Sequence, residues 1–281
     1  MSGKEVAARE KEKIRRTISN FARPPKLAVI MVGNNPASQA YVRGKEKDCE
    51  ECGIDCRVYR FDDTAAQSDL IVAVQTLNHR NDVDGILVQL PLPQHIDKNT
   101  VIEHIHPEKD VDCFRAESVG RLVLGRPTYM PCTPSGIVDL LEAFDIKVEG
   151  KNCVIIGRSD IVGKPMSALL TSMGGTVTTC HSKTKDISTY TRNADIIVCA
   201  VGKPGFLTAD MVKDGVVVVD VGINRGEDGK LCGDVDFASV SEKCSAITPV
   251  PGGVGLMTRV ALLKNTVKAY ATVNGSNSTG N

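Results

Sequence analysis

The chain has 281 residues, of which 42% are hydrophobic and 24% are charged. This composition is that of an ordinary globular protein, and the length is enough for two domains. The 34 Lys and Arg balance the 34 Asp and Glu, which argues against a nucleic-acid or anionic-membrane partner, because both require a basic surface. No apolar run approaches the roughly 18 residues of a membrane span. The charged N-terminal stretch favours a soluble cytoplasmic protein over a secreted one.

Ten cysteines are scattered along the chain, several of them inside apolar runs. In a reducing compartment such cysteines behave as small core residues. Only Cys49, Cys52 and Cys56 cluster, and no nearby His or Cys supplies a fourth metal ligand. We therefore expect no metal site.

The dominant pattern is an alternation of short apolar runs, rich in Val and Ile, with longer amphipathic stretches. The runs are residues 26–32, 56–61, 85–90, 152–157, 176–180, 194–201 and 215–222. Continuous apolar runs are typical of strands that are buried on both faces of a parallel sheet. The alternation predicts an α/β protein with doubly wound parallel sheets.

Helices are predicted between these runs. A charged amphipathic helix is expected over 4–20, and Asn35-Pro36 provides an N-cap and a first position for a helix over 36–52. Pro134 and Pro165 each open a further helix. A last helix is expected over 256–272, and the polar residues 273–281 predict a disordered tail.

The chain is predicted to form two domains. Residues 113–134 are rich in Gly, Pro and Arg and lack periodicity, which is typical of a connection between domains. Residues 152–222 contain a β-α-β-α-β-α-β series, which has the form of a nucleotide-binding unit. We assign residues 1–128 to an N-terminal α/β domain and residues 129–255 to a Rossmann-like domain.

The sequence GRSDIVGKP, residues 157–165, follows an apolar run but fits neither the Walker A loop nor the GxGxxG pattern. A glycine turn before a helix can still bind phosphate, and Arg158, Ser159 and Lys164 add donors. The next apolar run ends in TCHSKT, residues 179–184, without the acidic residue that NAD-binding units carry there. A basic, hydroxyl-bearing strand end would accept the 2′-phosphate of NADP. An ordinary turn with solvated charges is the alternative.

Other stretches carry candidate chemistry. Tyr41 and Lys45 share a helix face, where a ring can stack a flat substrate and an amine can move protons, but the spacing alone favours a solvated, charged helix surface. Gln89 lies at the carboxyl end of an apolar run, where α/β proteins place ligand groups. Two aspartates within 107–114 could bond an aminopyrimidine edge or simply be solvated. The turn 248–255 permits close approach of a ligand or merely connects two elements.

Eight motifs occur in order between residues 41 and 255: YVRGK, GILVQLPLP, KDVD, PCTPSG, GRSDIVGKP, CHSKT, DVGINR and TPVPGGVG. Together they resemble the signatures of the bifunctional methylenetetrahydrofolate dehydrogenase/cyclohydrolase family. The resemblance covers nearly the whole chain. It implies a folate-binding domain, completed by a returning C-terminal helix, and an NADP-binding domain that forms a homodimer. The implied reactions are oxidation of 5,10-methylenetetrahydrofolate to the methenyl form, with NADP, and hydrolysis of that product to 10-formyltetrahydrofolate.

The resemblance also implies a role for each matching residue. Tyr41 would stack on the folate, and Lys45 would be the central catalytic lysine, bonded and tuned by Gln89. Asp112 would hold the amino-pyrimidine edge of the pterin, so that these four residues count as catalytic. The folate pocket would further be lined by Gly252, Gly253 and Gly255. The cofactor would be bound by Gly157, Arg158, Ser159, Gly163, His181, Ser182, Gly222 and Ile223.

Two positions depart from the family pattern. Cys113 stands where the family usually has the glycine of DVDG, and Leu256 stands where it usually has proline. Both changes lie close to the folate and put the affinity for folate and the balance of the two activities in doubt more than the fold.

Three alternatives remain from the residues. A monofunctional dehydrogenase is disfavoured by Lys45 with Gln89. A non-catalytic NADP-binding regulator is disfavoured by the presence of Tyr41, Lys45 and Asp112. A shikimate-type dehydrogenase is disfavoured because it would require cationic residues to bind the carboxylate of its substrate, not the set Tyr41, Gln89 and Asp112.

Overall fold

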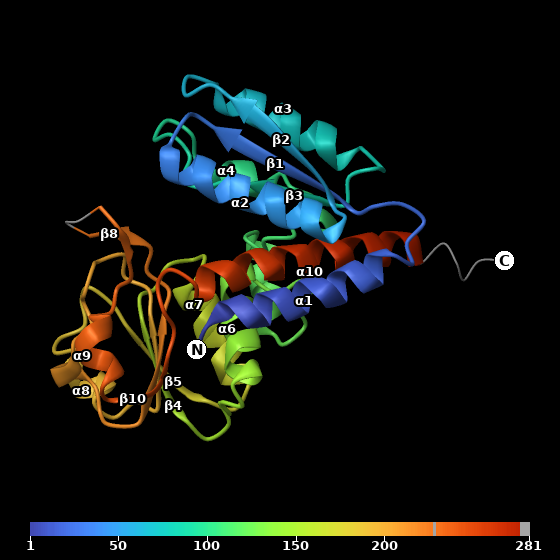
Figure 1. The fold of residues 1–281 in the computed structure, drawn as a ribbon. Coiled ribbons are helices and arrows are strands. Elements are labelled where there is room, and N and C mark those ends of the chain that lie inside the picture. Colours follow the sequence, from blue (N-terminus) through green and yellow to red (C-terminus); the bar gives the residue numbers. More distant parts are fainter. Residues whose placement is uncertain (227–228, 276–281) are drawn as a thin grey trace. The chain divides into compact units, whose positions relative to one another are not determined.

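The computed structural model describes residues 1–226 and 229–275, which form two compact units (Figure 1). Unit 1 comprises Met1–Ala8 and Thr133–Thr258, and unit 2 comprises Arg9–Cys132 and the described residues from Arg259 on. The chain changes unit after Cys132, whereas the predicted domain boundary lies at 128/129. The first eight residues also group with the second half of the chain, not with the first half.

Unit 2 is built on a three-stranded parallel sheet in the order β2-β1-β3. Its strands are β1 (Lys26–Val32), β2 (Asp55–Phe61) and β3 (Gly85–Val88), and its helices are α2 (Pro36–Cys52), α3 (Gln67–Asn78), α4 (Lys98–Glu103) and α5 (Ala116–Val123). The central strand β1 is almost wholly buried, as expected for a continuous apolar run covered on both faces. Alternate residues of β1 and β3 form one core cluster with apolar residues of α3 and α4.

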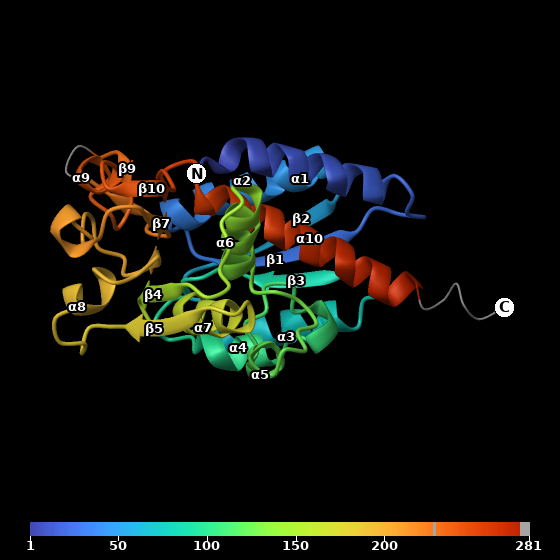
Figure 2. The same cartoon turned by 90° about the horizontal axis from the view of Figure 1, so that it is seen from below.

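The two ends of the chain contribute the remaining helical segments of unit 2. Arg9–Ile18 of α1 (Gly3–Ile18) and the part of α10 (Val254–Gly275) from Arg259 on lie side by side (Figures 1 and 2). An ion pair of 2.8 Å joins Lys264 to Glu10 there. The C-terminal helix thus returns to the first half of the chain. It also continues through residues 273–275, which were expected in the tail; residues 276–281 lie outside the described residues.

Unit 1 contains a five-stranded parallel sheet in the order β10-β7-β6-β4-β5. Its strands are β4 (Asn152–Ile156), β5 (Thr176–Cys180), β6 (Ile196–Cys199), β7 (Val216–Asp220) and β10 (Cys244–Ile247). Its helices are α6 (Cys132–Ala143), α7 (Gly163–Ser172), α8 (Ser188–Thr191) and α9 (Phe237–Ser241), and β8 (Asn224–Arg225) pairs with β9 (Leu231–Cys232). The strand order reverses between β4 and β6, which is where doubly wound proteins bind ligands, at the carboxyl ends of the strands.

Several details differ from the sequence prediction. Residues 113–134, predicted as an irregular connection, contain α5, whose buried Ser118 and Leu122 lie four residues apart as a helix requires. Between β6 and β7 the chain forms only the short 3-10 turn η2 (Ala209–Met211) in place of the predicted helix. The strand β10 was missed because its sequence, CSAI, is a short run without strong apolar character. A further 3-10 turn is η1 (Pro107–Lys109). Among the described helices, none is both long and apolar enough to cross a membrane.

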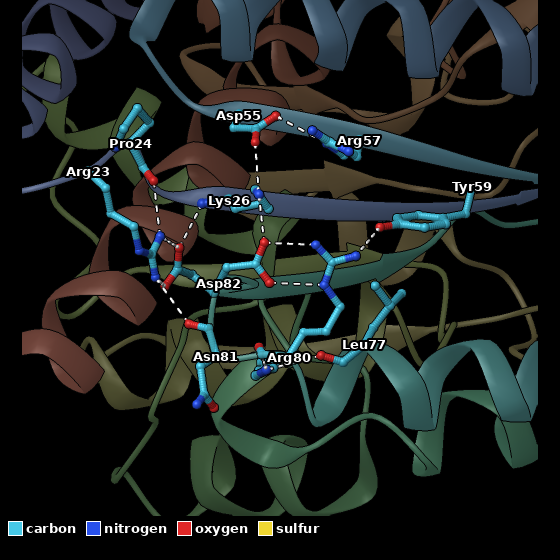
Figure 3. Close-up of polar contacts among 12 residues, drawn as sticks. Arg23, Pro24, Lys26, Asp55, Arg57, Tyr59, Leu77, Arg80, Asn81 and Asp82 are labelled. Atoms are coloured by element: carbon cyan, nitrogen blue, oxygen red, sulfur yellow. Dashed lines mark hydrogen bonds and ion pairs between the residues drawn. The ribbon is translucent and has the colours of Figure 1, made fainter.

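Charged pairs hold together the starts of the strands in unit 2 (Figure 3). The ammonium of Lys26 bonds Asp82 at 2.8 Å and pairs with Asp55 at 3.2 Å. Arg80 contacts both oxygens of Asp82, at 2.9 and 2.8 Å. In parallel α/β sheets ligands bind at the opposite, carboxyl edge, so we attribute a structural role to this network.

Candidate functional site

The helix α2 carries two of the candidate residues, and local sequence explains its bounds. The Asn35 side chain accepts hydrogen bonds from the backbone N–H groups of Ala37 (2.9 Å) and Ser38 (3.1 Å), which caps the helix. Gly53 ends it in the left-handed conformation, with φ +81°. The predicted helix over 36–52 is confirmed. Tyr41 and Lys45 therefore share one face of a helix with defined ends.

Lys45 is buried and bonded to Gln89. Its side chain donates to Gln89 Oε1 at 3.0 Å, its residue is 5% exposed, and Nζ lies 4.8 Å from the ring centroid of Tyr41. Gln89 is held in turn, since its backbone N–H donates to Ile30 O at 2.8 Å and its Nε2 donates to Leu90 O at 2.6 Å. The spacing alone favoured an exposed helix surface for Lys45. That prediction is wrong, because α2 turns the face that carries Lys45 toward the carboxyl end of β3.

Burial and opposite charge set the protonation of the site. Removal from water lowers the pKa of Lys45, and the charge of Asp112 partly opposes this shift. Burial likewise raises the pKa of Asp112, and Lys45 opposes that shift. Lys45 therefore loses its proton more readily than an exposed lysine does.

The two loop aspartates have different surroundings. Asp110 is buried and accepts hydrogen bonds from the Phe114 and Arg115 N–H groups, at 3.2 and 3.1 Å, and from the Ser118 hydroxyl at 2.6 Å. It thereby holds the segment that leads into α5 and is structural. Asp112 is only half-buried and interacts electrostatically with Lys45, so it is the aspartate that remains available for a ligand.

Cys113 and Asn265 shape the loop around Asp112. Cys113 is 1% exposed and has φ +62°, a left-handed conformation that favours the glycine usual in the family. From α10, Asn265 Nδ2 donates to the carbonyls of Val111 and Met130, both at 2.8 Å. Sequence analysis missed Asn265, and no local signal points to it, because its partner Val111 lies 154 positions away.

In unit 1 the predicted cofactor turn requires glycine. Gly157 has φ +126°, and a Cβ there would lie 2.2 Å from the carbonyl oxygen of Ala200. A Cβ on Gly163 would lie 2.2 Å from the carbonyl oxygen of Gly157, so the two glycines allow the turn to close tightly. The turn follows β4 at the reversal of strand order, and its shape therefore fits a dinucleotide held close to the backbone.

The first turn of α7 differs from the expected phosphate site. Ser159 Oγ accepts the N–H groups of Val162 (3.2 Å) and Gly163 (3.4 Å), and its carbonyl accepts that of Lys164 at 3.0 Å. Pro165 has no N–H. The donors that a Rossmann turn offers to phosphate are thus bonded within the turn, which gives a physical reason why this stretch departs from GxGxxG.

The other predicted cofactor residues lie at strand ends of the same sheet. His181 follows β5, and its Nδ1 accepts the N–H of Lys183 at 3.1 Å. Gly222 is buried just after β7, where its N–H donates to Asp220 Oδ1 at 2.9 Å. Exposed side chains complete the set: Arg158, Ser159, Ser182 and Ile223.

The glycines predicted to line the folate pocket also belong to unit 1. Gly252 has φ +105° and accepts the N–H of Gly3 at 2.8 Å. A Cβ on Gly253 would lie 2.6 Å from Pro249 O, and Gly255 lies in the first turn of α10. Across residues 1–226 and 229–275, no group of three or more His, Cys, Asp or Glu side chains is arranged to hold a metal ion.

Comparison with known proteins places this geometry in a family. Residues 1–112 match the model of the tetrahydrofolate dehydrogenase/cyclohydrolase catalytic domain, and residues 131–274 match that of the NAD(P)-binding domain of the same enzymes. The chain belongs to this family.

Individual relatives agree over nearly the full length. The bifunctional protein FolD of Campylobacter hominis is 54% identical over 272 residues, 96% of either chain. The crystal structure of the Campylobacter jejuni bifunctional enzyme superposes with a TM-score of 0.95 at 52% identity, covering 97% of this chain and 98% of that one. The Trypanosoma brucei enzyme, solved with NADP and an inhibitor, has a TM-score of 0.94 at 36% identity, covering 98% and 97%.

Proposed function

We propose that this chain oxidises 5,10-methylenetetrahydrofolate to the methenyl form with NADP and hydrolyses that product to 10-formyltetrahydrofolate. The observation that carries the proposal is the buried Lys45, bonded to Gln89 at 3.0 Å beside the ring of Tyr41, in a member of the tetrahydrofolate dehydrogenase/cyclohydrolase family. A lone surface lysine would not support catalysis in this way, because its pKa would be ordinary.

Both side chains and backbone hold the substrate. Tyr41 stacks on the folate, and the Asp112 carboxylate accepts two parallel hydrogen bonds from the amino-pyrimidine edge of the pterin. Gly252, Gly253 and Gly255 line the pocket with backbone. The conformations of Gly252 and Gly253 support this role, since a side chain at either position would be strained or would meet backbone.

Bound NADP supplies the hydride acceptor for the oxidation. Loss of hydride leaves a cationic methenyl bridge, so this step requires geometry more than a base, and the chain contributes by holding the folate in place. The cofactor is bound at Gly157 and Gly163, with Gly222 and Ile223 also contributing. Arg158, Ser159, His181 and Ser182 take the adenosine end and its 2′-phosphate, which is consistent with the absence of an acidic residue from 179–184.

Hydrolysis depends on Lys45. Water must attack the bridge carbon and give up a proton, and the bond from that carbon to N5 must then break, which leaves the formyl group on N10. Burial has already lowered the pKa of Lys45, and the cationic bridge lowers it further, because like charges disfavour the ammonium. The neutral amine then accepts the proton. Gln89 keeps the amine in place through the oxygen of its amide.

A two-wavelength assay with methylenetetrahydrofolate and NADP tests the proposal, because it follows NADPH and the methenyl intermediate together. We expect NADPH to form without lasting accumulation of the methenyl form. Accumulating methenyl product would indicate a monofunctional dehydrogenase, and no NADPH with either cofactor would refute the oxidation. The ratio of kcat/KM for NADP and NAD should favour NADP.

Variants of α2 then assign the role of the lysine. Lys45→Met should abolish hydrolysis and spare some hydride transfer. Lys47→Met is the matched control, since Lys47 lies on the same helix with a side chain that is 76% exposed. Unchanged hydrolysis in Lys45→Met would overturn the assignment.

Two further parts of the proposal concern the enzyme as a whole. We infer a homodimer formed through the NADP-binding domain and a cytoplasmic location. Light scattering on the purified chain tests the first, and fractionation of the source cells tests the second.

A further inference from the structure

Two aspartates that sequence analysis did not single out are buried in unit 1. Asp220 ends β7 and is 2% exposed, and Asp234 follows β9 and is 0% exposed. Buried carboxylates persist only where hydrogen bonds satisfy them. The partners of these two connect three segments at the carboxyl edge of the sheet.

Asp234 holds the turn that follows β6. Its Oδ2 accepts the N–H groups of Val201 (2.6 Å) and Gly202 (2.9 Å), and its Oδ1 accepts that of Lys203 at 2.9 Å. The same Oδ1 accepts Asn224 Nδ2 at 2.8 Å. Three successive N–H groups that converge on one carboxylate form an anion-binding concavity, and here the anion belongs to the protein. The turn has therefore one defined backbone shape.

Asp220 in turn accepts backbone N–H groups, including that of Asp234. Its Oδ1 accepts the N–H groups of Gly222 and Asp234, both at 2.9 Å, and its Oδ2 accepts that of Val235 at 3.0 Å. The carboxylates lie so close to the backbone that neighbouring residues must be glycine. A Cβ on Gly222 would lie 2.3 Å from Asp234 Oδ1.

The turn held by Asp234 lies beside the proposed cofactor turn. Strands β4 and β6 are neighbours at the reversal of strand order, where doubly wound proteins bind nucleotides. Ala200, the first residue after β6, donates its N–H to Ile156 O at 2.8 Å. Its carbonyl oxygen would lie 2.2 Å from a Cβ on Gly157. The turn Val201–Lys203 therefore begins directly after a residue that packs against the proposed cofactor turn.

We propose that Asp234 is a positioning residue for the nicotinamide cofactor, because it fixes the turn Val201–Lys203 and, through Asn224, the segment after β7. The inference rests on the proposed function, which places NADP in this crevice. Asp234 need not touch the cofactor. It acts by presenting the two segments in one arrangement, which the cofactor then meets without reorganising them.

The substitution Asp234→Asn probes this role with little change in shape. One acceptor oxygen becomes an NH₂ group, which faces backbone N–H donors and cannot accept from them. The turn must then rearrange or leave a buried donor unsatisfied. Oxidation needs the cofactor, but hydrolysis of methenyltetrahydrofolate needs no hydride acceptor. Hydrolysis therefore reports whether the rest of the enzyme is intact.

The experiment measures NADPH affinity by fluorescence titration, the KM for NADP and for methylenetetrahydrofolate, and the rate of methenyl hydrolysis. In Asp234→Asn we expect Kd and KM for the cofactor to rise roughly tenfold, because a turn that has rearranged to satisfy its donors must return to its original shape when the cofactor binds, at a cost comparable to one unsatisfied buried donor. The folate KM and the hydrolysis rate should stay within about twofold. Asn224→Ala removes one bond without stranding a backbone donor, so we expect a cofactor change of about threefold in the same direction.

Asp236→Asn is the matched control. Asp236 lies two positions further on and accepts the Ser239 hydroxyl at 2.6 Å at the start of α9, so its loss should leave cofactor affinity unchanged. Unchanged NADPH affinity in Asp234→Asn would overturn the proposal. An equal loss of hydrolysis would also overturn it, because Asp234 would then be a general stabilising residue. A wild-type enzyme that reduces neither NADP nor NAD would instead refute the proposed function.

Discussion

Replacement of Cys113 by glycine and by alanine separates backbone strain from packing in the loop beside Asp112. Cys113 has φ +62° and is 1% exposed. Both replacements remove the buried sulfur, at a cost of about 1 kcal/mol. Only glycine relieves the left-handed backbone, which costs other residues roughly 1–2 kcal/mol.

The magnitude follows from the two opposing effects on glycine. At an ordinary position a glycine variant is less stable than an alanine variant by about 0.4–1 kcal/mol, because glycine gives the unfolded chain more conformational freedom. At position 113 the strain outweighs this effect, so Cys113→Gly should be more stable than Cys113→Ala by up to about 1 kcal/mol. That difference corresponds to a Tm higher by roughly 2–4 °C.

Thermal and urea unfolding of both variants provide the measurement. Cys153 supplies the matched control, since it is also 1% exposed but lies in β4 with an extended backbone. At that position Cys153→Ala should be more stable than Cys153→Gly. An alanine variant at least as stable as the glycine variant at position 113 would refute the strain argument.

Three further predictions follow from the site and from the charged network. Because burial lowers the pKa of Lys45 below its usual 10.5, the rate of enzymatic hydrolysis, corrected for the uncatalysed rate, should fall as the pH falls through that lowered pKa. Below that pKa the buried lysine is ionised, which also opposes folding, so Lys45→Met should unfold at a higher denaturant concentration than the wild type at neutral pH. Asp84→Ala should cost about 1–3 kcal/mol in urea unfolding, because the Lys26 N–H, which donates to this buried carboxylate at 2.7 Å, loses its acceptor, and Arg23 loses its bonds of 2.7 and 2.8 Å. Asp82→Ala, at a carboxylate that is 45% exposed, should cost about 1 kcal/mol or less. Gly157→Ala should weaken NADPH binding by at least about tenfold, since its Cβ would meet Ala200 O, and equal affinity in a titration would contradict this.

Signals confined to a few neighbouring residues were sufficient for much of the fold. Asn35, Pro36 and Gly53 determine both ends of α2, because caps act on backbone groups within one turn. Apolar runs such as 26–32 became buried strands at the predicted positions. The ordered motifs carried the family resemblance, which full-length similarity to known members confirmed.

Burial and long-range pairing were decided by the tertiary structure. The spacing of Tyr41 and Lys45 is that of an exposed helix face, yet Lys45 is buried against Gln89, 44 positions away. Asp220 and Asp234 meet only because β7 and the β8–β9 hairpin return to the same sheet edge. Local sequence dictates which backbone shape a segment adopts, but the desolvation of a charge depends on what other segments bring to it.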